Sequence, residues 1–124
     1  MKKLLEEIKN SFSLLDLKED WDEDGAKPPT EISFSRMLEF FGCLISKDVN
    51  TNIKPNIFPC GYGSIDISFR IDNDIRLLIN ISDERIGWYG DIKTEKSDSD
   101  FQIKGEQKNV FNNELFEWIK NNIK

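Results

Sequence analysis

The sequence predicts an α+β fold, with two N-terminal helices, a small antiparallel β-meander of three to five strands and a C-terminal helix. Apolar residues first recur with the period of a helix, and near residue 55 the pattern changes to the two-residue period of a strand. The helical period returns near residue 111. The length of 124 residues is that of one domain, so we expect residues 1–124 to share a single core.

The N-terminal part contains two amphipathic patterns. The first predicts a helix over residues 2–17, with five apolar residues on one face: Leu4, Leu5, Ile8, Phe12 and Leu15. The second helix is expected to begin within residues 30–33, with Thr30 or Pro29 near the cap, and to end near Lys47. Its buried stripe would be formed by Phe34, Met37, Leu38, Phe41, Leu44 and Ile45.

Alternation of apolar and polar residues predicts three strands in the second half of the chain. They cover residues 65–71, 75–81 and 86–92, and turn-forming residues at 72–74 and 82–84 separate them. Consecutive strands joined by such short turns are typical of an antiparallel meander with one packed face and one partly solvated face.

Shorter elements are expected around this meander. A brief strand near Ile57 should end at Pro59, because proline is confined to strand ends and edges. Residues 93–100 contain no apolar residue and are predicted to be a solvated loop, followed by a brief edge strand near Phe101 and Ile103. A C-terminal helix, capped by Asn109 or Asn112, would bury Phe111, Leu115, Trp118, Ile119 and Ile123.

The composition excludes most catalytic and metal chemistry. The chain has no histidine and two cysteines, so it cannot form a Ser-His or Cys-His pair, a histidine-containing zinc site or a four-thiolate site. No motif locates a catalytic pocket, and we therefore expect a protein that is not an enzyme and has no cofactor. The formal charge of −6 argues against nucleic acid as a ligand and fits either a basic partner or simple solubility.

The apolar runs of the chain are far shorter than the roughly 20 residues that a membrane span requires. Glu6, Glu7 and Lys9 interrupt the run that a signal peptide would need after the starting methionine. We therefore expect a cytoplasmic protein that does not contact membranes. In that reducing compartment Cys43 and Cys60 would remain free thiols.

The segment between the two predicted helices, which we call the acidic loop (residues 20–29), combines a tryptophan with several carboxylates. We expect Trp21 to be buried as an anchor while the carboxylates point outward: Asp20, Asp22, Glu23 and Asp24. Gly25 allows the chain to turn, and Pro28 and Pro29 stiffen its exit.

The acidic loop also satisfies the string of an EF-hand calcium loop, with Glu31 as the closing ligand. Lys27 occupies the position where such loops carry an aliphatic residue, and the two prolines stiffen the chain where it would wrap the ion. No second loop of this kind is present to form the usual pair. A structural turn is the preferred interpretation, and no metal site is predicted.

Two further features are candidates for contact with a partner. Tyr62, Trp88 and Tyr89 are aromatic residues in or beside the predicted meander, and Tyr89 should face solvent because Trp88 alternates toward the core. A second acidic cluster is formed by Glu95, Asp98 and Asp100. For each acidic cluster, a merely solvated surface is the alternative interpretation.

The pattern Trp21-Asp22-x-x-Gly25-Ala26-x-Pro28, followed by Pro55-x-Ile57-x-Pro59-x-x-x-Gly63-Ser64-Ile65, resembles a loose group of short, largely uncharacterised bacterial proteins. That group is similar to the antitoxins and immunity proteins encoded beside bacterial toxins. The resemblance covers roughly residues 15–92 and carries no catalytic residue across. It implies that Trp21, Asp22, Gly25 and Ala26 form a fold-defining turn.

Two functional hypotheses follow. In the first, the protein binds and neutralises a cognate toxin encoded by an adjacent gene, most plausibly a basic nuclease-type protein. Its contacts would come from Asp20, Asp22, Glu23, Asp24, Tyr89, Glu95, Asp98 and Asp100. In the second, the segment from Asp20 to Glu31 forms a calcium- or ligand-responsive module.

Overall fold

The computed structural model describes residues 2–47, 49, 54–71, 74–94 and 97–123. Its helical segments are α1 (Lys2–Asn10), the 3-10 helix η1 (Ser11–Asp16), α2 (Glu31–Ser46) and α3 (Asn113–Asn122). Its strands are β1 (Asn56–Pro59), β2 (Ile65–Ile71), β3 (Ile75–Ile81), β4 (Ile86–Thr94) and β5 (Ser97–Gln107).

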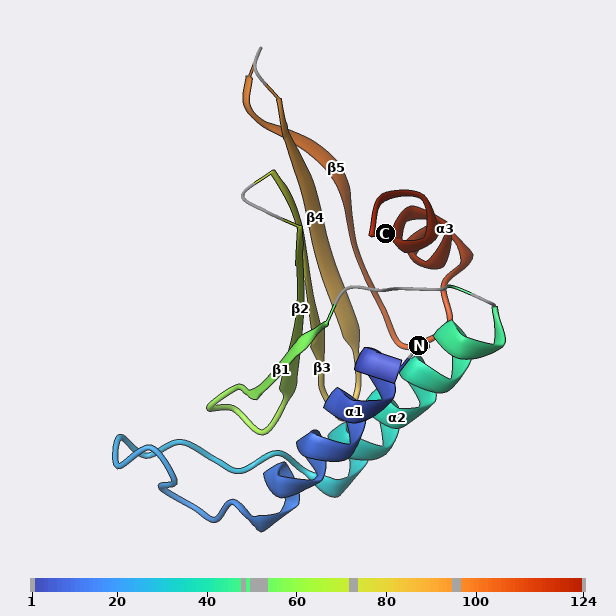
Figure 1. Ribbon diagram of the computed structural model, residues 1–124. Coiled ribbons are helices and arrows are strands. Elements are labelled where there is room, and N and C mark those ends of the chain that lie inside the picture. The colour runs from blue at the N-terminus through green and yellow to red at the C-terminus, as the bar shows by residue number, and fades with distance from the viewer. Residues whose placement is uncertain (1, 48, 50–53, 72–73, 95–96, 124) are drawn as a thin grey trace.

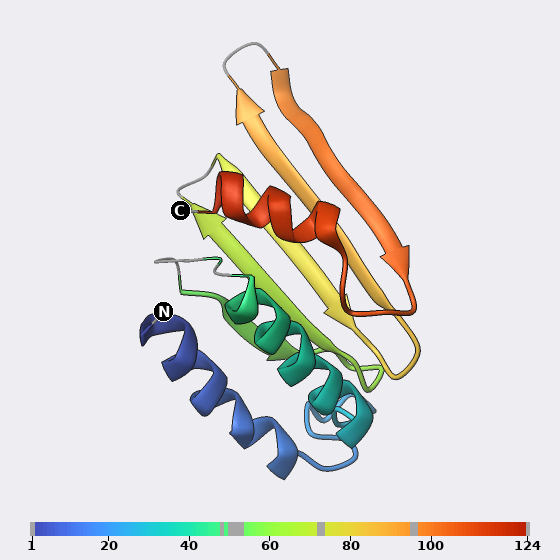
Figure 2. The same cartoon turned by 90° about the vertical axis from the view of Figure 1, so that its right-hand side faces the viewer.

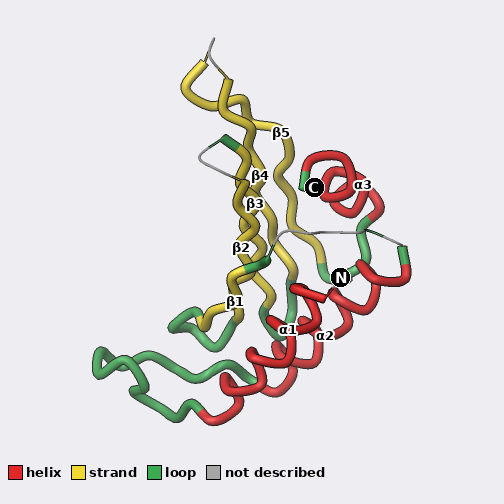
Figure 3. The backbone as a smooth tube through the Cα atoms, in the orientation of Figure 1, coloured by secondary structure: helices red, strands yellow, loops and turns green. Residues whose placement is uncertain are grey.

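The strands form one antiparallel sheet in the order β1-β2-β3-β4-β5, so each strand pairs with its neighbours in sequence. All the helices lie against one face of this sheet, with α3 crossing it (Figures 1 and 2). We call this the inner face and the opposite one the outer face. Figure 3 shows helices on one side and strands on the other, which is a two-layer α+β arrangement and confirms the predicted class.

The core forms where the inner face meets α2 and α3. Alternation along the strands turns Ile67, Ile79 and Trp88 to this face in register with one another. Phe40 of α2 and Phe116 of α3 lie almost completely buried with their ring centroids 5.6 Å apart. The apolar stripe of α2 and the alternating strand residues are therefore the two halves of one core.

Two glycines let large rings lie flat on the inner face. A Cβ at Gly105 would come within 2.2 Å of the Trp88 ring, its partner across β4 and β5. A Cβ at Gly90 would come within 3.0 Å of the Trp118 ring, which α3 brings down onto the sheet. The absence of a side chain at Gly90 sets how closely Trp118 of α3 can approach the sheet, and its absence at Gly105 leaves room for the Trp88 ring.

The start of the chain differs from the prediction, because three helical segments rather than two precede the sheet. The predicted helix over residues 2–17 is α-helical only to Asn10 and continues as η1. The Ser11 hydroxyl donates to the carbonyl of Ile8, a local bond that competes with regular α-helix geometry. The tighter 3-10 turn rotates the predicted apolar face, so that Phe12 is exposed while Leu14 is buried.

The other helix boundaries agree with the sequence. Thr30 caps α2 by accepting a hydrogen bond from the Ser33 amide, and Lys47 follows its last residue. Asn112 caps α3 through the amide of Leu115, which decides between the two predicted caps. Pro59 ends β1, as expected for a residue that cannot donate to a ladder.

The predicted loop over residues 93–100 is wrong for residues 93–94 and 97–100, which are strand, while residues 95–96 lie outside the described residues. β4 continues to Thr94 and β5 begins at Ser97, with Thr94 opposite Ser97 and Ile92 opposite Asp100. The end of this hairpin extends beyond α3 (Figures 1 and 2). A hairpin outside the helical layer needs backbone pairing but no apolar face, which explains why the hydrophobic pattern did not reveal it.

Candidate partner-binding surface

The acidic loop is closed by hydrogen bonds of its own backbone. The Asp20 amide donates to the carbonyl of Ala26 at 2.8 Å, and the Glu23 amide donates to the carbonyl of Asp20 at 3.0 Å. Asp20 and Glu23 adopt positive φ angles of 63° and 64°, and Gly25 has a φ of 82°. Such left-handed positions persist in non-glycine residues when surrounding contacts hold them, so the loop has a defined shape.

Two carboxylates of the loop face its own amides. Asp22 Oδ1 accepts from the amides of Asp24 at 2.9 Å and Ala26 at 3.0 Å, and Asp20 Oδ1 accepts from the Gly25 amide at 2.6 Å. The hydrogen bond from Asp24, followed by that from Ala26, holds the pKa of Asp22 below its ordinary value of 3.8. These oxygens stabilise an Asx-type turn.

The hydrogen bonds of Asp20 and Asp22 differ from the arrangement that an EF-hand calcium loop requires. In an EF-hand the carboxylates at the first, third and fifth positions turn their oxygens to the ion. Here the first two of them, Asp20 and Asp22, turn an oxygen toward backbone amides of the loop. Within the described residues, no three Asp, Glu, Cys or His side chains gather closely enough to hold a metal ion.

Trp21 does not anchor the loop in the core, and that expectation is wrong. Its side chain is half-buried, and its indole N–H donates to the carbonyl of Lys27 at 2.9 Å. The ring therefore crosses the loop and ties its two sides together. The residues of this segment that are buried are Ala26 and Pro29. The indole N–H explains why Trp21 stays at the surface. A fully buried indole would need a hydrogen-bond acceptor inside the core, whereas here the carbonyl of Lys27 accepts from it.

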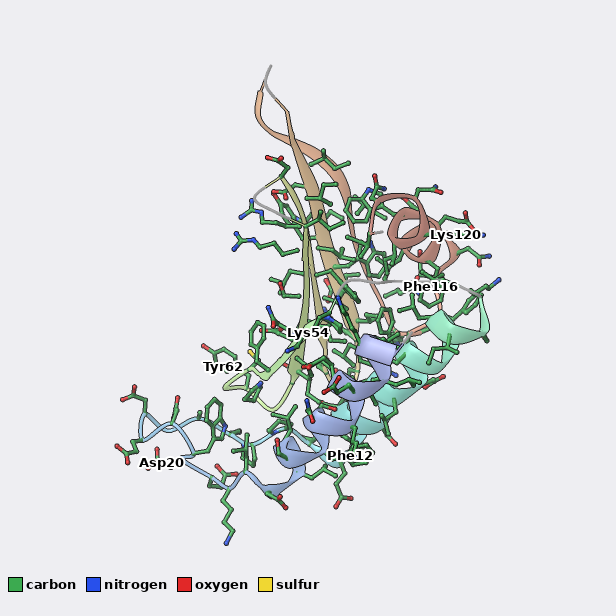
Figure 4. All side chains as sticks on the ribbon, in the orientation of Figure 1. Phe12, Asp20, Lys54, Tyr62, Phe116 and Lys120 are labelled. Atoms are coloured by element: carbon green, nitrogen blue, oxygen red, sulfur yellow. The ribbon has the colours of Figure 1, made fainter. Side chains whose placement is uncertain are left out.

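The acidic loop is attached to the turn between β1 and β2. The Lys27 amide donates to the carbonyl of Gly61 at 2.9 Å, and the Thr30 amide donates to the carbonyl of Gly63 at 3.0 Å. Tyr62 lies between these two contacts and is 90% exposed. Figure 4 shows Tyr62 and Asp20 at the same end of the molecule.

The turn between β3 and β4 joins the same end. The Thr30 hydroxyl donates to the Asp83 carboxylate, and Ser33 Oγ lies 3.1 Å from Asp83 Oδ1. Asp83 thereby places its negative charge at the N-terminus of α2, where the helix dipole stabilises it. A hollow of about 340 Å³ opens here, with Tyr62, Asp83 and Glu84 among its lining residues.

We call this region the acidic end: the acidic loop together with turns 60–64 and 82–85. Its carboxylates belong to Asp20, Asp22, Glu23, Asp24, Asp83 and Glu84. Arg85 is the cation of the β3–β4 turn, and its Nη1 lies 2.7 Å from Glu106 Oε1. That hydrogen bond raises the pKa of Arg85. The two opposite charges lie in contact and compensate each other. Lys27 is the other cation of the acidic end.

The remaining predicted contact residues lie elsewhere. Tyr89 is 42% exposed on the outer face, opposite Leu78 on β3 and Lys104 on β5. Asp98 and Asp100 belong to β5 near its hairpin end, while Glu95 lies outside the described residues. Gln107, the partner of Ile86, lies nine positions after Asp98 along β5, which corresponds to about 30 Å in an extended strand. The two acidic clusters therefore do not form one surface.

From the three aromatic candidates the list of predicted contact residues takes Tyr89 and not Tyr62, and it also lacks Asp83 and Glu84. The fold brings these three missing residues together at the acidic end. The sequence does contain a signal for the exposure of Tyr62. Glycines on both sides of it mark a turn, and a side chain in such a turn points to solvent more often than into the core. No local pattern marks Asp83 or Glu84, since their position depends on how the turn after β3 meets α2.

Comparisons of the chain with models of known protein families, with curated proteins and with solved structures find no match. The argument about function therefore rests on the site itself. Over the residues that the structure describes, no helix has both the length and the apolar character needed to cross a membrane.

Proposed function

We propose that the protein is a cytoplasmic, non-enzymatic binding protein of the immunity or antitoxin kind. It neutralises a basic, nuclease-type bacterial toxin by covering the toxin's cationic surface with the acidic end. The observation that carries this proposal is the exposure of Tyr62, at 90%, beside a set of carboxylates on a loop of defined shape. An exposed aromatic ring inside a charged surface is the composition typical of energetically dominant contacts between proteins.

The chemistry of the proposed partner follows from these charges. A nuclease presents Lys and Arg side chains to phosphate groups, and carboxylates can occupy the same positions. Complementary charge accelerates encounter, whereas a central aromatic residue contributes most of the affinity. Because hydrogen bonds within the loop already fix the carboxylates of Asp20 and Asp22, binding would cost little further ordering entropy.

The test is to co-express the protein with the product of its adjacent gene, and to measure growth, complex formation and association rate. The double substitution Glu23→Lys and Glu84→Lys reverses two charges of the acidic end. In the described part of the chain, neither glutamate side chain forms a hydrogen bond, so the change should not disturb the fold. We expect this double variant to associate about 10-fold more slowly at low salt, and the difference to shrink at high salt. Tyr62→Ala should instead raise the dissociation rate about 10-fold or more.

Glu117→Lys is the matched control, because it makes the same charge change at an exposed position of α3, away from the acidic end. Its association rate should match that of the unmodified protein. A harmless neighbouring gene product that forms no complex would contradict the proposed function. A complex with unchanged rates in all three variants would keep the function and reject the acidic end as its contact surface.

A further inference from the structure

The outer face of the sheet carries a second surface with a different chemistry. Among the described elements, no helix covers this face (Figures 1 and 2). Leu78 and Tyr89 lie directly opposite each other on β3 and β4 and are 45% and 42% exposed. An exposed aliphatic and aromatic pair in the middle of a sheet offers an apolar wall to a ligand.

Two arginines stand next to this wall in an arrangement that is unfavourable by itself. Arg70 of β2 and Arg76 of β3 are directly opposite each other in the register. Like charges at directly opposed positions destabilise a pair of strands. The Asp91 carboxylate beside Arg76 offsets part of this repulsion, and an anion held between the two arginines would offset the rest.

Arg76 is positioned by a buried carboxylate. Asp91 is 2% exposed and accepts from Arg76 Nη2 at 2.7 Å and from Arg76 Nε at 3.2 Å. Arginine is always charged in proteins, and the hydrogen bond with Asp91 raises the pKa of Arg76 further. This bidentate contact fixes the plane of a guanidinium whose side chain remains 51% exposed.

Arg70 differs from Arg76, because the described part of the chain places no carboxylate in an ion pair with it. Two other carboxylates of the described sheet residues are already engaged. Asp66 accepts from the side-chain amide of Asn80 at 2.7 Å, and Glu106 pairs with Arg85. Among the described residues, the charge of Arg70 therefore has no compensating carboxylate, although the net charge of the protein is −6.

A hollow of about 390 Å³ opens at this point. Its lining combines donors with apolar groups: Asn56, Ser68, Arg70, Arg76, Leu77, Leu78 and Tyr89. The volume lies near the lower end of the range for small-molecule sites, roughly 300–1,000 Å³. One side of the hollow can therefore donate hydrogen bonds to an anionic group while the other contacts an apolar body.

We propose that this hollow binds a small organic anion in which a carboxylate or phosphate is joined to an apolar group of about the size of a phenyl ring. The anionic group contacts Arg70 and the free edge of Arg76, with Ser68 and Asn56 as further donors. The apolar group packs on Leu78 and the Tyr89 ring. This site is separate from the acidic end and does not depend on the function proposed for it.

The experiment is a titration followed by two-dimensional amide NMR spectra, with four probes: phenyl phosphate, 3-phenylpropionate, inorganic phosphate and benzyl alcohol. At least one aromatic anion should saturate below about 10 mM and shift amides of residues 68–70, 76–78 and 89. Inorganic phosphate should bind about 10-fold more weakly, and benzyl alcohol should not saturate. Tighter binding of phenyl phosphate than of 3-phenylpropionate assigns a phosphate ligand, and the reverse order assigns a carboxylate.

Arg70→Gln is the decisive variant, because it leaves the contact between Arg76 and Asp91 in place. It should weaken binding of the tighter probe about 10-fold, which corresponds to about 1.4 kcal/mol. Lys18→Gln makes the same charge change at an exposed residue before the acidic loop and should leave affinity unchanged within a factor of about 2. The proposal is overturned if neither aromatic anion saturates, if the shifts lie elsewhere, or if the two variants weaken binding equally.

Discussion

Phe40 and Asp22 belong to adjoining parts of the chain, but different interactions hold their surroundings in place. Phe40 is completely buried, with the rings of Phe41 and Phe116 at centroid distances of 5.4 and 5.6 Å. Asp22 is exposed and accepts two backbone hydrogen bonds. The core around Phe40 is stabilised by apolar burial, while the acidic loop owes its shape to polar contacts within a few residues.

Because of this difference, the residues that stabilise the fold are not the residues that give the acidic loop its charge. Burial of the inner face supplies the free energy of folding and constrains residues across α2, α3 and the sheet at once. The acidic loop contributes little apolar area, so its side chains can change without unfolding the protein. A surface that recognises a partner gains from this separation, because its charges can be altered independently of the core.

The largest expected effect comes from breaking the core. Phe40→Ala removes a fully buried ring between α2 and α3, and should lower the free energy of unfolding by about 3–5 kcal/mol. Phe12→Ala makes the same change at a ring that is 49% exposed on η1 and contacts Phe34, and should cost about 1 kcal/mol. Urea unfolding followed by circular dichroism measures both. Equal losses in the two variants would show that burial does not distinguish these positions.

The sequence predicts the core well because burial leaves a periodic signal. The apolar stripe of α2, the alternation in β2 to β4 and the caps Thr30 and Asn112 all follow from local spacing. It predicts β5 poorly, since residues 97–100 pair through backbone groups and leave no apolar pattern.

The structure of the acidic loop can be predicted from the sequence only in part. Its composition identifies a turn, and the pairing of Asp22 with nearby amides is a local property of aspartate. The attachment of Lys27 to Gly61, which brings Tyr62 beside the loop, joins distant segments and has no local signature. The same limit applies to Arg70 and Arg76, whose opposition depends on the register of β2 and β3.

A smaller effect is expected at Trp21. Trp21→Ala removes a half-buried ring and the hydrogen bond to Lys27, and should lower the free energy of unfolding by about 1–2 kcal/mol. Trp21→Phe keeps most of the ring but not its N–H donor, and should recover part of that loss. Denaturant unfolding of the two variants beside Phe40→Ala gives the comparison. A loss in Trp21→Ala as large as that in Phe40→Ala would mean that the loop is anchored in the core after all.

The smallest effect is a local one and depends on pH. Because the amides of Asp24 and Ala26 bond the ionised carboxylate, the pKa of Asp22 in the folded protein lies below the ordinary value of 3.8. A carboxyl group whose pKa is lowered by folding contributes stability that is fully present above its unfolded pKa. That contribution is lost as the pH falls through the lowered pKa. The acidic loop should therefore keep its shape at neutral pH and loosen only below about 3.8.

Amide and side-chain carboxyl chemical shifts measure this titration directly. The Asp22 carboxyl should titrate with a midpoint below 3.8, and the amide shifts of Asp24 and Ala26 should follow the same curve. The amide of Leu44, a fully buried residue of α2 away from the acidic loop, should remain unchanged over that range, because apolar contacts hold its surroundings. In Asp22→Asn the side-chain oxygen can still accept a hydrogen bond but no longer ionises, so the two amides should lose this titration. A midpoint at or above 3.8, or an unaltered titration of both amides in Asp22→Asn, would show that this carboxylate does not hold the loop.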